Sequence, residues 1–207
     1  MERDELIKKI IDAEWQMFTS VNGANGRASC QDDQKTFIVM RKAQTDIWSK
    51  ETLESYMEDL KAASGQGVNL MSIKYARMMQ VTHPDEYEQI KERLPVIPDS
   101  VAELVNTITE YHLAWAMEAR EKYPHLSMLG RPVSSGLDVS QQTISIQNYL
   151  KSELLTYSEK TLKLCLKDTV QAFDNKVNLT LEILKNTAKS YGYESLDAIE
   201  ERLSKQT

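Results

Sequence analysis

Apolar residues recur with the period of an α-helix along most of this chain, and this pattern limits the possible fold more than any other feature. In residues 4–19 the apolar side chains stand three or four positions apart, so a helix would carry them on one broad face. At least four segments show this period, whereas the alternating runs typical of strands are almost absent. The best strand candidate, residues 143–146, is short. The sequence therefore predicts an all-α fold.

Glycine and proline, which commonly end helices, are few: the 207 residues include seven glycines and five prolines. Their positions and the capping residues predict helices over residues 4–19, 33–48, 50–64, 70–81 and 101–122, two more between 146 and 190, and short ones over 85–94 and after 194. We expect a bundle of roughly six to eight helices in one domain spanning residues 1–207. A long irregular loop is expected near residues 124–142.

Charge and hydropathy argue against several classes of protein. The formal net charge of −6 disfavours a nucleic-acid partner, because such a surface needs clustered Lys and Arg. The longest apolar runs are only a few residues, whereas a membrane span needs roughly 20. The first ten residues, MERDELIKKI, carry charges of both signs and no apolar stretch, unlike a secretory signal. We therefore expect a cytoplasmic protein without a membrane partner.

Familiar cofactor and metal motifs do not occur in the sequence. There is no GxGxxG segment, no P-loop and no Glu-x-x-His pair of the kind that builds carboxylate metal sites. The two cysteines, Cys30 and Cys165, are too far apart for a zinc-type spacing. We expect no metal, and the sequence assigns neither a cofactor nor an oligomeric state.

Glu14 is the polar residue that fits the apolar pattern least. On a helix a residue lies beside those three, four and seven positions away, and for Glu14 these neighbours include Ile7, Ile10, Ile11, Met17 and Phe18. A buried carboxylate without a partner costs several kcal/mol, even after the protein relaxes around it. We therefore expect Glu14 to be buried and to contact a basic residue, with Arg41 as the first choice.

The same test finds polar side chains on other predicted apolar faces. They are Arg41, Gln44, Lys74, Arg77 and His112, and the pair Glu153 and Tyr157 on the helix that begins near residue 146. One interpretation is structural: Arg41 pairs with Glu14, His112 is a hydrogen-bonded core residue, and Lys74 and Arg77 extend past the core to solvent. The other is that these side chains converge on a polar pocket with apolar walls, as ligand sites do. The number of helices that carry such a residue favours a pocket.

Cys30 lies in a polar turn, three residues after Arg27 and just before a predicted helix. Nearby positive charge and helix N-termini lower the pKa of a thiol, whereas Asp32 and Asp33 act in the opposite direction. Cys30 is therefore either a reactive thiol or an inert surface residue. Cys165 lies among leucines of a predicted helix and is expected only to pack.

Seven short stretches together resemble the bacterial family known as domain of unknown function 4125. They are EWQMF (14–18), GRASCQDD (26–33), FIVMRKAQ (37–44), KYARMM (74–79), GRP (130–132), TYSEKTL (156–162) and YGYESL (191–196), in order over nearly the whole chain. The resemblance implies a mostly helical, one-domain cytoplasmic protein. It implies no activity and assigns no role to any residue.

The leading functional hypothesis is a small-molecule enzyme or binder with a polar pocket inside the bundle. Its ligand is expected to be anionic or zwitterionic, such as an amino acid or a phosphorylated metabolite. Arg27, Arg41 and Arg77 would hold the anionic group, because a guanidinium pairs bidentately with carboxylate or phosphate. The remaining residues of the predicted ligand site are Gln44, Lys74, Glu153 and Tyr157.

Catalytic roles are predicted for three residues. Glu14 would bind an ammonium group or act as an acid/base, with His112 as a second proton carrier. Cys30 would be a nucleophile or a residue at the rim of the pocket. The alternative is a non-catalytic interaction protein whose buried polar residues only form ion pairs.

Overall fold

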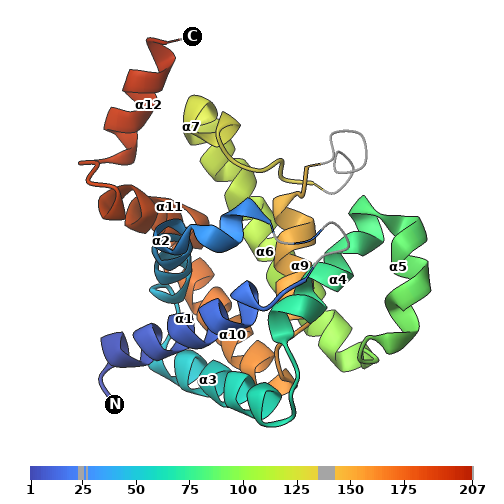
Figure 1. Cartoon of the computed structure of the whole chain (residues 1–207). Coiled ribbons are helices and arrows are strands. Elements are labelled where there is room, and N and C mark those ends of the chain that lie inside the picture. The colour runs from blue at the N-terminus through green and yellow to red at the C-terminus, as the bar shows by residue number, and fades with distance from the viewer. Residues whose placement is uncertain (23–25, 27, 135–142, 207) are drawn as a thin grey trace.

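The computed structural model describes residues 1–22, 26, 28–134 and 143–206, and within these ranges the protein is all-α (Figure 1). Helix accounts for 76% of the structure, and the described residues form no strand. The helices are α1 (Arg3–Thr19), α2 (Gln34–Thr45), α3 (Lys50–Gly65), α4 (Leu70–Thr82), α5 (Pro84–Ile90), α6 (Asp99–Lys122), α7 (Pro124–Met128), α9 (Ile146–Leu154), α10 (Glu159–Asp174), α11 (Leu179–Ser190) and α12 (Leu196–Ser204). Two short 3-10 turns, η1 (Ser29–Asp32) and η2 (Lys91–Arg93), complete the described elements.

Most of these helices begin at a residue whose side chain caps the first turn. In each case an oxygen of the side chain accepts a hydrogen bond from a backbone N–H that has no partner within the helix. These caps are Asp33, Ser49, Asn69, Ser145, Ser158, Asn178 and Ser195. The starts of the main helices are therefore encoded locally.

The core lies where α1 and α3 meet α6, α9 and α10. Helix α1 packs on α2, α3 and α4, while α6 packs on α9, α10 and α11. The central apolar cluster includes Leu6, Ile10, Leu53, Ile108 and Leu162, each at most 1% exposed. The two termini lie far apart in Figure 1, with α12 extending from the top of the molecule beside α7.

The expected count of six to eight helices is wrong, because the described residues form eleven α-helices. Pro84 and Pro124 each begin a short helix, since proline is well suited to the first helical turn. Residues 146–190 also contain three helices, α9, α10 and α11, where two were expected. Ser158, with extended backbone dihedrals, accepts from Thr161 N at 3.2 Å and starts α10 separately from α9.

The irregular loop expected near 124–142 is helical at its beginning. Helix α7 covers Pro124–Met128, and the part of the loop over 135–142 lies outside the described residues. Glu200 of α12 accepts hydrogen bonds from the backbone N–H groups of His125 and Leu126 at 2.9 and 2.8 Å. Because this cap comes from 75 positions along the chain, the local sequence of α7 does not reveal it.

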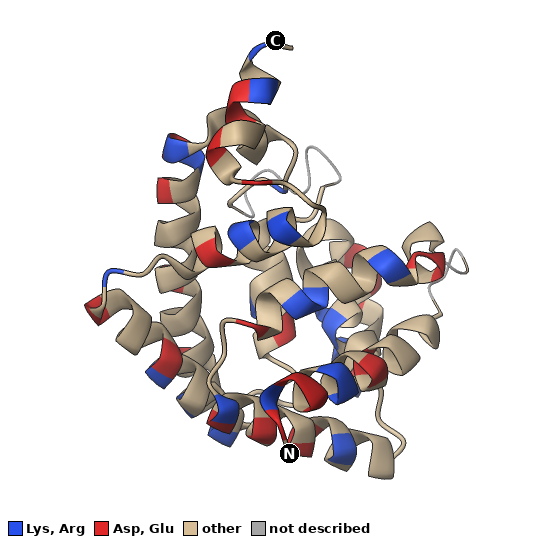
Figure 2. Ribbon diagram, turned by 90° about the vertical axis from the view of Figure 1, so that its left-hand side faces the viewer, with Lys and Arg blue, Asp and Glu red and all other residues tan. Residues whose placement is uncertain are grey.

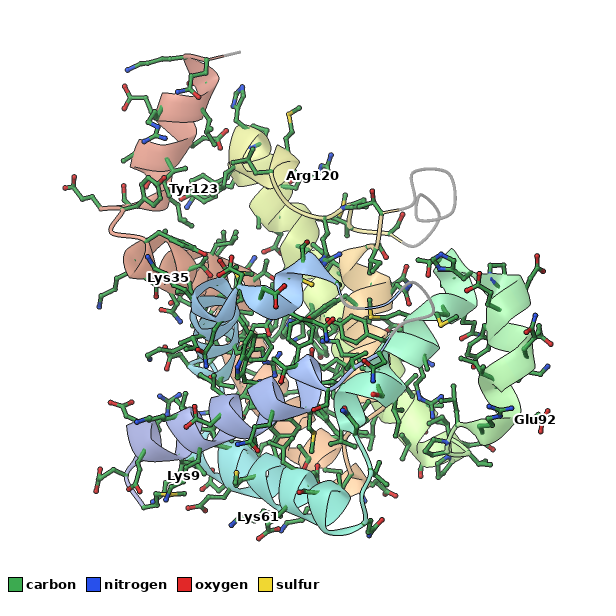
Figure 3. All side chains as sticks on the ribbon, in the orientation of Figure 1. Lys9, Lys35, Lys61, Glu92, Arg120 and Tyr123 are labelled. Carbon is green, nitrogen blue, oxygen red and sulfur yellow. The ribbon has the colours of Figure 1, made fainter. Side chains whose placement is uncertain are left out.

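Charged residues of both signs are mixed along the helices on the side shown in Figure 2. Lys9, Lys35, Lys61 and Glu92 lie at the periphery in Figure 3, and all four are exposed. None of the helices in the described ranges combines the length and apolar composition that a membrane span requires. The expectation of one domain over residues 1–207 stays a prediction.

The end of α11 gives the first testable prediction. Gly192 has φ +81°, its N–H donates to Lys189 O, and Tyr193 N donates to Ala188 O, both at 3.0 Å. This is a Schellman cap, in which a residue with a side chain is strained. We expect Gly192→Ala to lower the free energy of unfolding by about 1 kcal/mol in urea titrations.

The matched control is Gly65→Ala at the end of α3. Gly65 lacks a left-handed φ, and a Cβ added there meets nothing within 4 Å. Since alanine favours helix over glycine, G65A should preserve or raise stability. Equal losses in the two variants would contradict the backbone explanation.

Candidate functional site

Glu14 and Arg41 form a bidentate ion pair inside the protein. Arg41 Nε donates to Glu14 Oε2 at 2.7 Å, and Arg41 Nη2 donates to Glu14 Oε1 at 2.5 Å. Glu14 of α1 is 0% exposed and Arg41 of α2 is 3% exposed. The prediction that Glu14 is buried against Arg41 is therefore confirmed. The pair joins two helices that follow one another in the chain.

A second carboxylate extends this pair into a network. Arg41 Nη1 donates to Glu153 Oε1 of α9 at 2.9 Å and also to Gln44 Oε1. Lys74 of α4 donates through Nζ to Glu153 Oε2. Lys74 is only 2% exposed, so it does not extend to solvent as the structural interpretation expected. Two carboxylates and two cations thus neutralise one another in the interior.

Aromatic side chains surround the four charges. Tyr56 donates its hydroxyl to Glu14 Oε1 at 2.7 Å, and Tyr157 donates to Glu153 Oε1 at 2.8 Å. The two tyrosine rings lie 4.6 Å apart, and Trp48 meets each of them edge-on. The Lys74 ammonium lies 3.5 Å from the centre of the Tyr149 ring, in a cation–π contact. We call Glu14, Arg41, Lys74, Glu153, Tyr56 and Tyr157 the buried charge network.

The pKa shifts show how the network keeps its charges. Burial acts to lower the pKa of Arg41, but the Glu14 and Glu153 carboxylates outweigh it and raise that pKa well above the usual value. Burial likewise acts to raise the pKa of Glu153, but Arg41 and Lys74 hold it well below its usual range. Burial and the neighbouring carboxylate raise the pKa of Tyr56. The phenol therefore stays protonated and donates its hydrogen bond.

Tyr157 belongs to the network but not to a helix. It was expected on the same helix as Glu153, but α9 ends at Leu154, and Tyr157 lies in the connection to α10. Its N–H donates to Leu154 O at 3.0 Å, so a turn carries its ring back toward Glu153. The turn therefore brings Tyr157 close to Glu153, as helical spacing was expected to do.

Within the described residues, neither Cys30 nor His112 forms a hydrogen bond or ion pair with the buried charge network. Cys30 is exposed in η1, which packs on α1 and α2. His112 lies on α6, where its ring meets Trp115 edge-on at 5.3 Å. Cys165 is buried in the central apolar cluster, and burial raises the pKa of its thiol. Arg27 lies outside the described residues.

Arg77 lies apart from the network, in a groove between α4 and α9 with a volume of about 450 Å³. We call it the α4–α9 groove, and its lining residues are Arg77, Gln80, Val81, Gln147, Asn148, Lys151, Ser152 and Leu155. Arg77 is 7% exposed and donates through Nη2 to Pro95 O at 2.7 Å. Its buried Nε has no hydrogen-bond partner among the described residues. The groove thus contains a buried cation with an unused donor.

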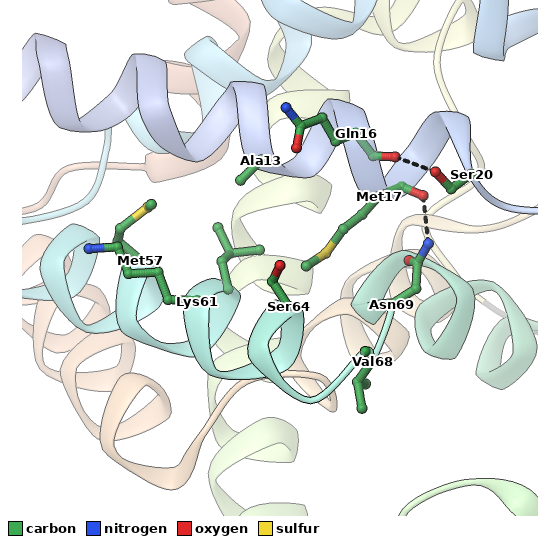
Figure 4. Close-up of a pocket in the computed structure, with 11 residues that line it drawn as sticks. Ala13, Gln16, Met17, Ser20, Met57, Lys61, Ser64, Val68 and Asn69 are labelled. Carbon is green, nitrogen blue, oxygen red and sulfur yellow. Dashed lines mark hydrogen bonds between the residues drawn. The ribbon is translucent and has the colours of Figure 1, made fainter.

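A second groove, of about 480 Å³, lies between α1 and α3 (Figure 4). Its walls include Met17, and two of its polar side chains bond within the protein. Asn69 Nδ2 donates to Met17 O at 2.7 Å, and Ser20 Oγ donates to Gln16 O at 2.8 Å. Unlike the α4–α9 groove, it contains no buried charged side chain.

Sequence reasoning missed Tyr56, Tyr149 and Lys151. Tyr56 could have been found, because it shares an apolar helical face with Leu53 and Leu60 and its hydroxyl needs an acceptor. Tyr149 contacts Lys74, and Lys151 lines the α4–α9 groove, because α9 packs on α4. No local sequence pattern specifies this packing. Among the described residues, no group of three His, Cys, Asp or Glu side chains could hold a metal ion.

Within the described residues, the fold and this geometry define an all-helical protein with a neutral buried charge network. Its α4–α9 groove is lined by a buried guanidinium that forms no ion pair with a described residue. The chain matches the model of the family described as "Protein of unknown function (DUF4125)" over residues 4–201 of 207. It therefore belongs to that family, which confirms the resemblance drawn from its sequence motifs. The comparisons with curated proteins and with solved structures found no match.

The buried charge network gives a stability prediction. Glu14→Gln leaves Arg41 with one fewer countercharge in a site without solvent, and breaking such a pair costs about 3–5 kcal/mol. We expect a loss of this size in the free energy of unfolding, measured by urea titration. The control is Glu5→Gln on the same helix, because Glu5 pairs with Lys9 at the surface and should matter little. Similar losses in both variants would contradict a special role for Glu14.

His112 gives a pH prediction. Burial lowers its pKa from 6.5 to about 4, so on acidification the unfolded chain takes up this proton first. Protonation of His112 therefore favours unfolding. The contribution of His112 to the free energy of unfolding falls as the pH drops from about 6.5 to 4. We expect His112→Leu to show a shallower decline of unfolding free energy across this window. The exposed His83 is the matched control, and H83L should retain the wild-type slope.

Proposed function

We propose that the protein binds a small anionic molecule in the α4–α9 groove, with Arg77 as the main contact. The observation that carries the proposal is the state of Arg77. Arg77 is only 7% exposed, it forms no ion pair with a described residue, and its Nε has no hydrogen-bond partner among those residues. Burial lowers the pKa of Arg77, and no carboxylate acts against this.

The other buried cations show what Arg77 lacks. Arg41 is paired with two carboxylates and Lys74 with one, as a charge removed from water requires. Among the described residues, the hydrogen bond of Arg77 goes to the Pro95 carbonyl, which orients the guanidinium without neutralising it. An anionic ligand would supply the missing charge and could accept two parallel hydrogen bonds from the guanidinium.

The rest of the groove suits an anion. Lys151 adds a second cation, and none of the lining residues that the structure describes is Asp or Glu. Ser152 donates its hydroxyl to Asn148 Oδ1 at 3.3 Å, and Asn148 Nδ2 donates to Met78 O at 3.0 Å. These side chains are thereby held in place as a polar wall. The described lining includes no His, Cys or carboxylate that could move a proton or attack a substrate, and we therefore propose binding.

In this proposal the buried charge network supports the site instead of forming it. Lys74 and Arg77 are three residues apart on α4, and Glu153 follows Ser152 on α9. The Lys74–Glu153 ion pair therefore fastens together the two helices that form the groove walls. The ligand role predicted for Arg77 is kept, while Arg41, Gln44, Lys74, Glu153 and Tyr157 serve as scaffold.

The proposal is tested by the melting temperature in the presence of anions. Inorganic phosphate and acetate, titrated at constant ionic strength, should raise the melting temperature of the wild type, because a ligand of the folded state stabilises it. Arg77→Met should abolish the rise. The unliganded variant should be at least as stable as the wild type, since it removes a buried unpaired charge.

The control is Arg120→Met, which removes an exposed arginine from α6. It should retain the wild-type response to anions. If R77M fails to fold, Arg77→Lys, which keeps the charge and loses the bidentate geometry, should fold and respond weakly. An unchanged response in both Arg77 variants, or no response in the wild type, would overturn the proposal.

A further inference from the structure

The charge and spacing of the α4–α9 groove specify its ligand further. We infer that the anion is a phosphate monoester in its doubly charged form, held by Arg77 and Lys151 from opposite walls. This inference rests on the function proposed above and narrows it from anions in general to one chemical class.

The charge balance of the groove favours a doubly charged ligand. Arg77 and Lys151 both line it, and neither forms an ion pair with any other described residue. Since no carboxylate is among the described lining residues, Arg77 and Lys151 give the groove two positive charges. A carboxylate or a sulfate ester supplies one negative charge and would leave one cation unpaired. A phosphate monoester carries nearly two at neutral pH, because its second pKa is about 6.

Each wall presents one continuous helical face. On α9 and its C-cap residue Leu155, the lining residues Lys151, Ser152 and Leu155 lie three, four and seven positions after Asn148, and thus share one face with it. On α4, Arg77, Gln80 and Val81 are related in the same way. The faces oppose each other because α4 packs on α9. One ligand can therefore contact both walls.

Hydrogen-bond donors and apolar groups both lie along these faces. The free N–H groups of Arg77 and the ammonium of Lys151 are donors, which suits a phosphate with three terminal acceptor oxygens. Val81 and Leu155, in contrast, offer only aliphatic contacts. They suit the carbon part of a monoester better than a second charged group.

The test compares two ligands of nearly the same shape that differ by one charge. Phenyl phosphate and phenyl sulfate are titrated into the full-length protein by calorimetry, about two pH units above the second phosphate pKa near 6. We expect phenyl phosphate to bind at least about tenfold more tightly, which corresponds to one additional charge-assisted contact of about 1.4 kcal/mol. Equal affinities, or tighter binding of phenyl sulfate, would overturn the inference.

Two variants separate this inference from the proposed function. Lys151→Met should lower the affinity for phenyl phosphate until it equals the affinity for phenyl sulfate. The affinity for phenyl sulfate should stay nearly unchanged. The control Lys167→Met, on the exposed face of α10, should change neither. If both compounds bind equally and R77M abolishes both, the anion site stands and the assignment to phosphate fails. If R77M binds both as the wild type does, the proposed function itself fails.

Discussion

The bond of Arg41 to two carboxylates is the interaction on which the rest of the structure depends. One guanidinium binds Glu14 through Nε and Nη2 and Glu153 through Nη1, and so connects α2 to both α1 and α9. Through Glu153 the connection continues to Lys74 on α4. The helices α1, α2, α4 and α9 are thereby connected at one point, and α4 and α9 are the two helices that line the α4–α9 groove.

Part of this network is predictable from the sequence and part is not. Glu14 is identified by its apolar neighbours on one helix, and Arg41 is the nearest basic residue on a facing apolar stripe. Both inferences need only the helical period and the free energy of a buried charge. The pairing of Glu153 with Lys74 depends on which face of α9 meets α4. Periodicity shows that each residue points inward, but it cannot specify the partner.

The fold shows the same division between local and long-range information. Side chains of Asp33, Ser49 and Asn69 start their helices through contacts three residues away, so these starts can be inferred from sequence. Helix α7 is different, because Glu200 supplies the cap from α12. The sequence from residue 124 onward contains glycine and proline and is typical of a loop. Only the tertiary contact explains why it begins as a helix.

The neutrality of the buried charge network also constrains how such a sequence can change over time. Two opposite charges can often be exchanged together for apolar residues at little cost, but each single exchange leaves the other charge stranded in the interior. Any series of single substitutions that alters position 14, 41, 74 or 153 therefore passes through a variant of low stability. Substitutions at these positions should therefore occur together, because a change at one position is tolerated only when its partner changes as well.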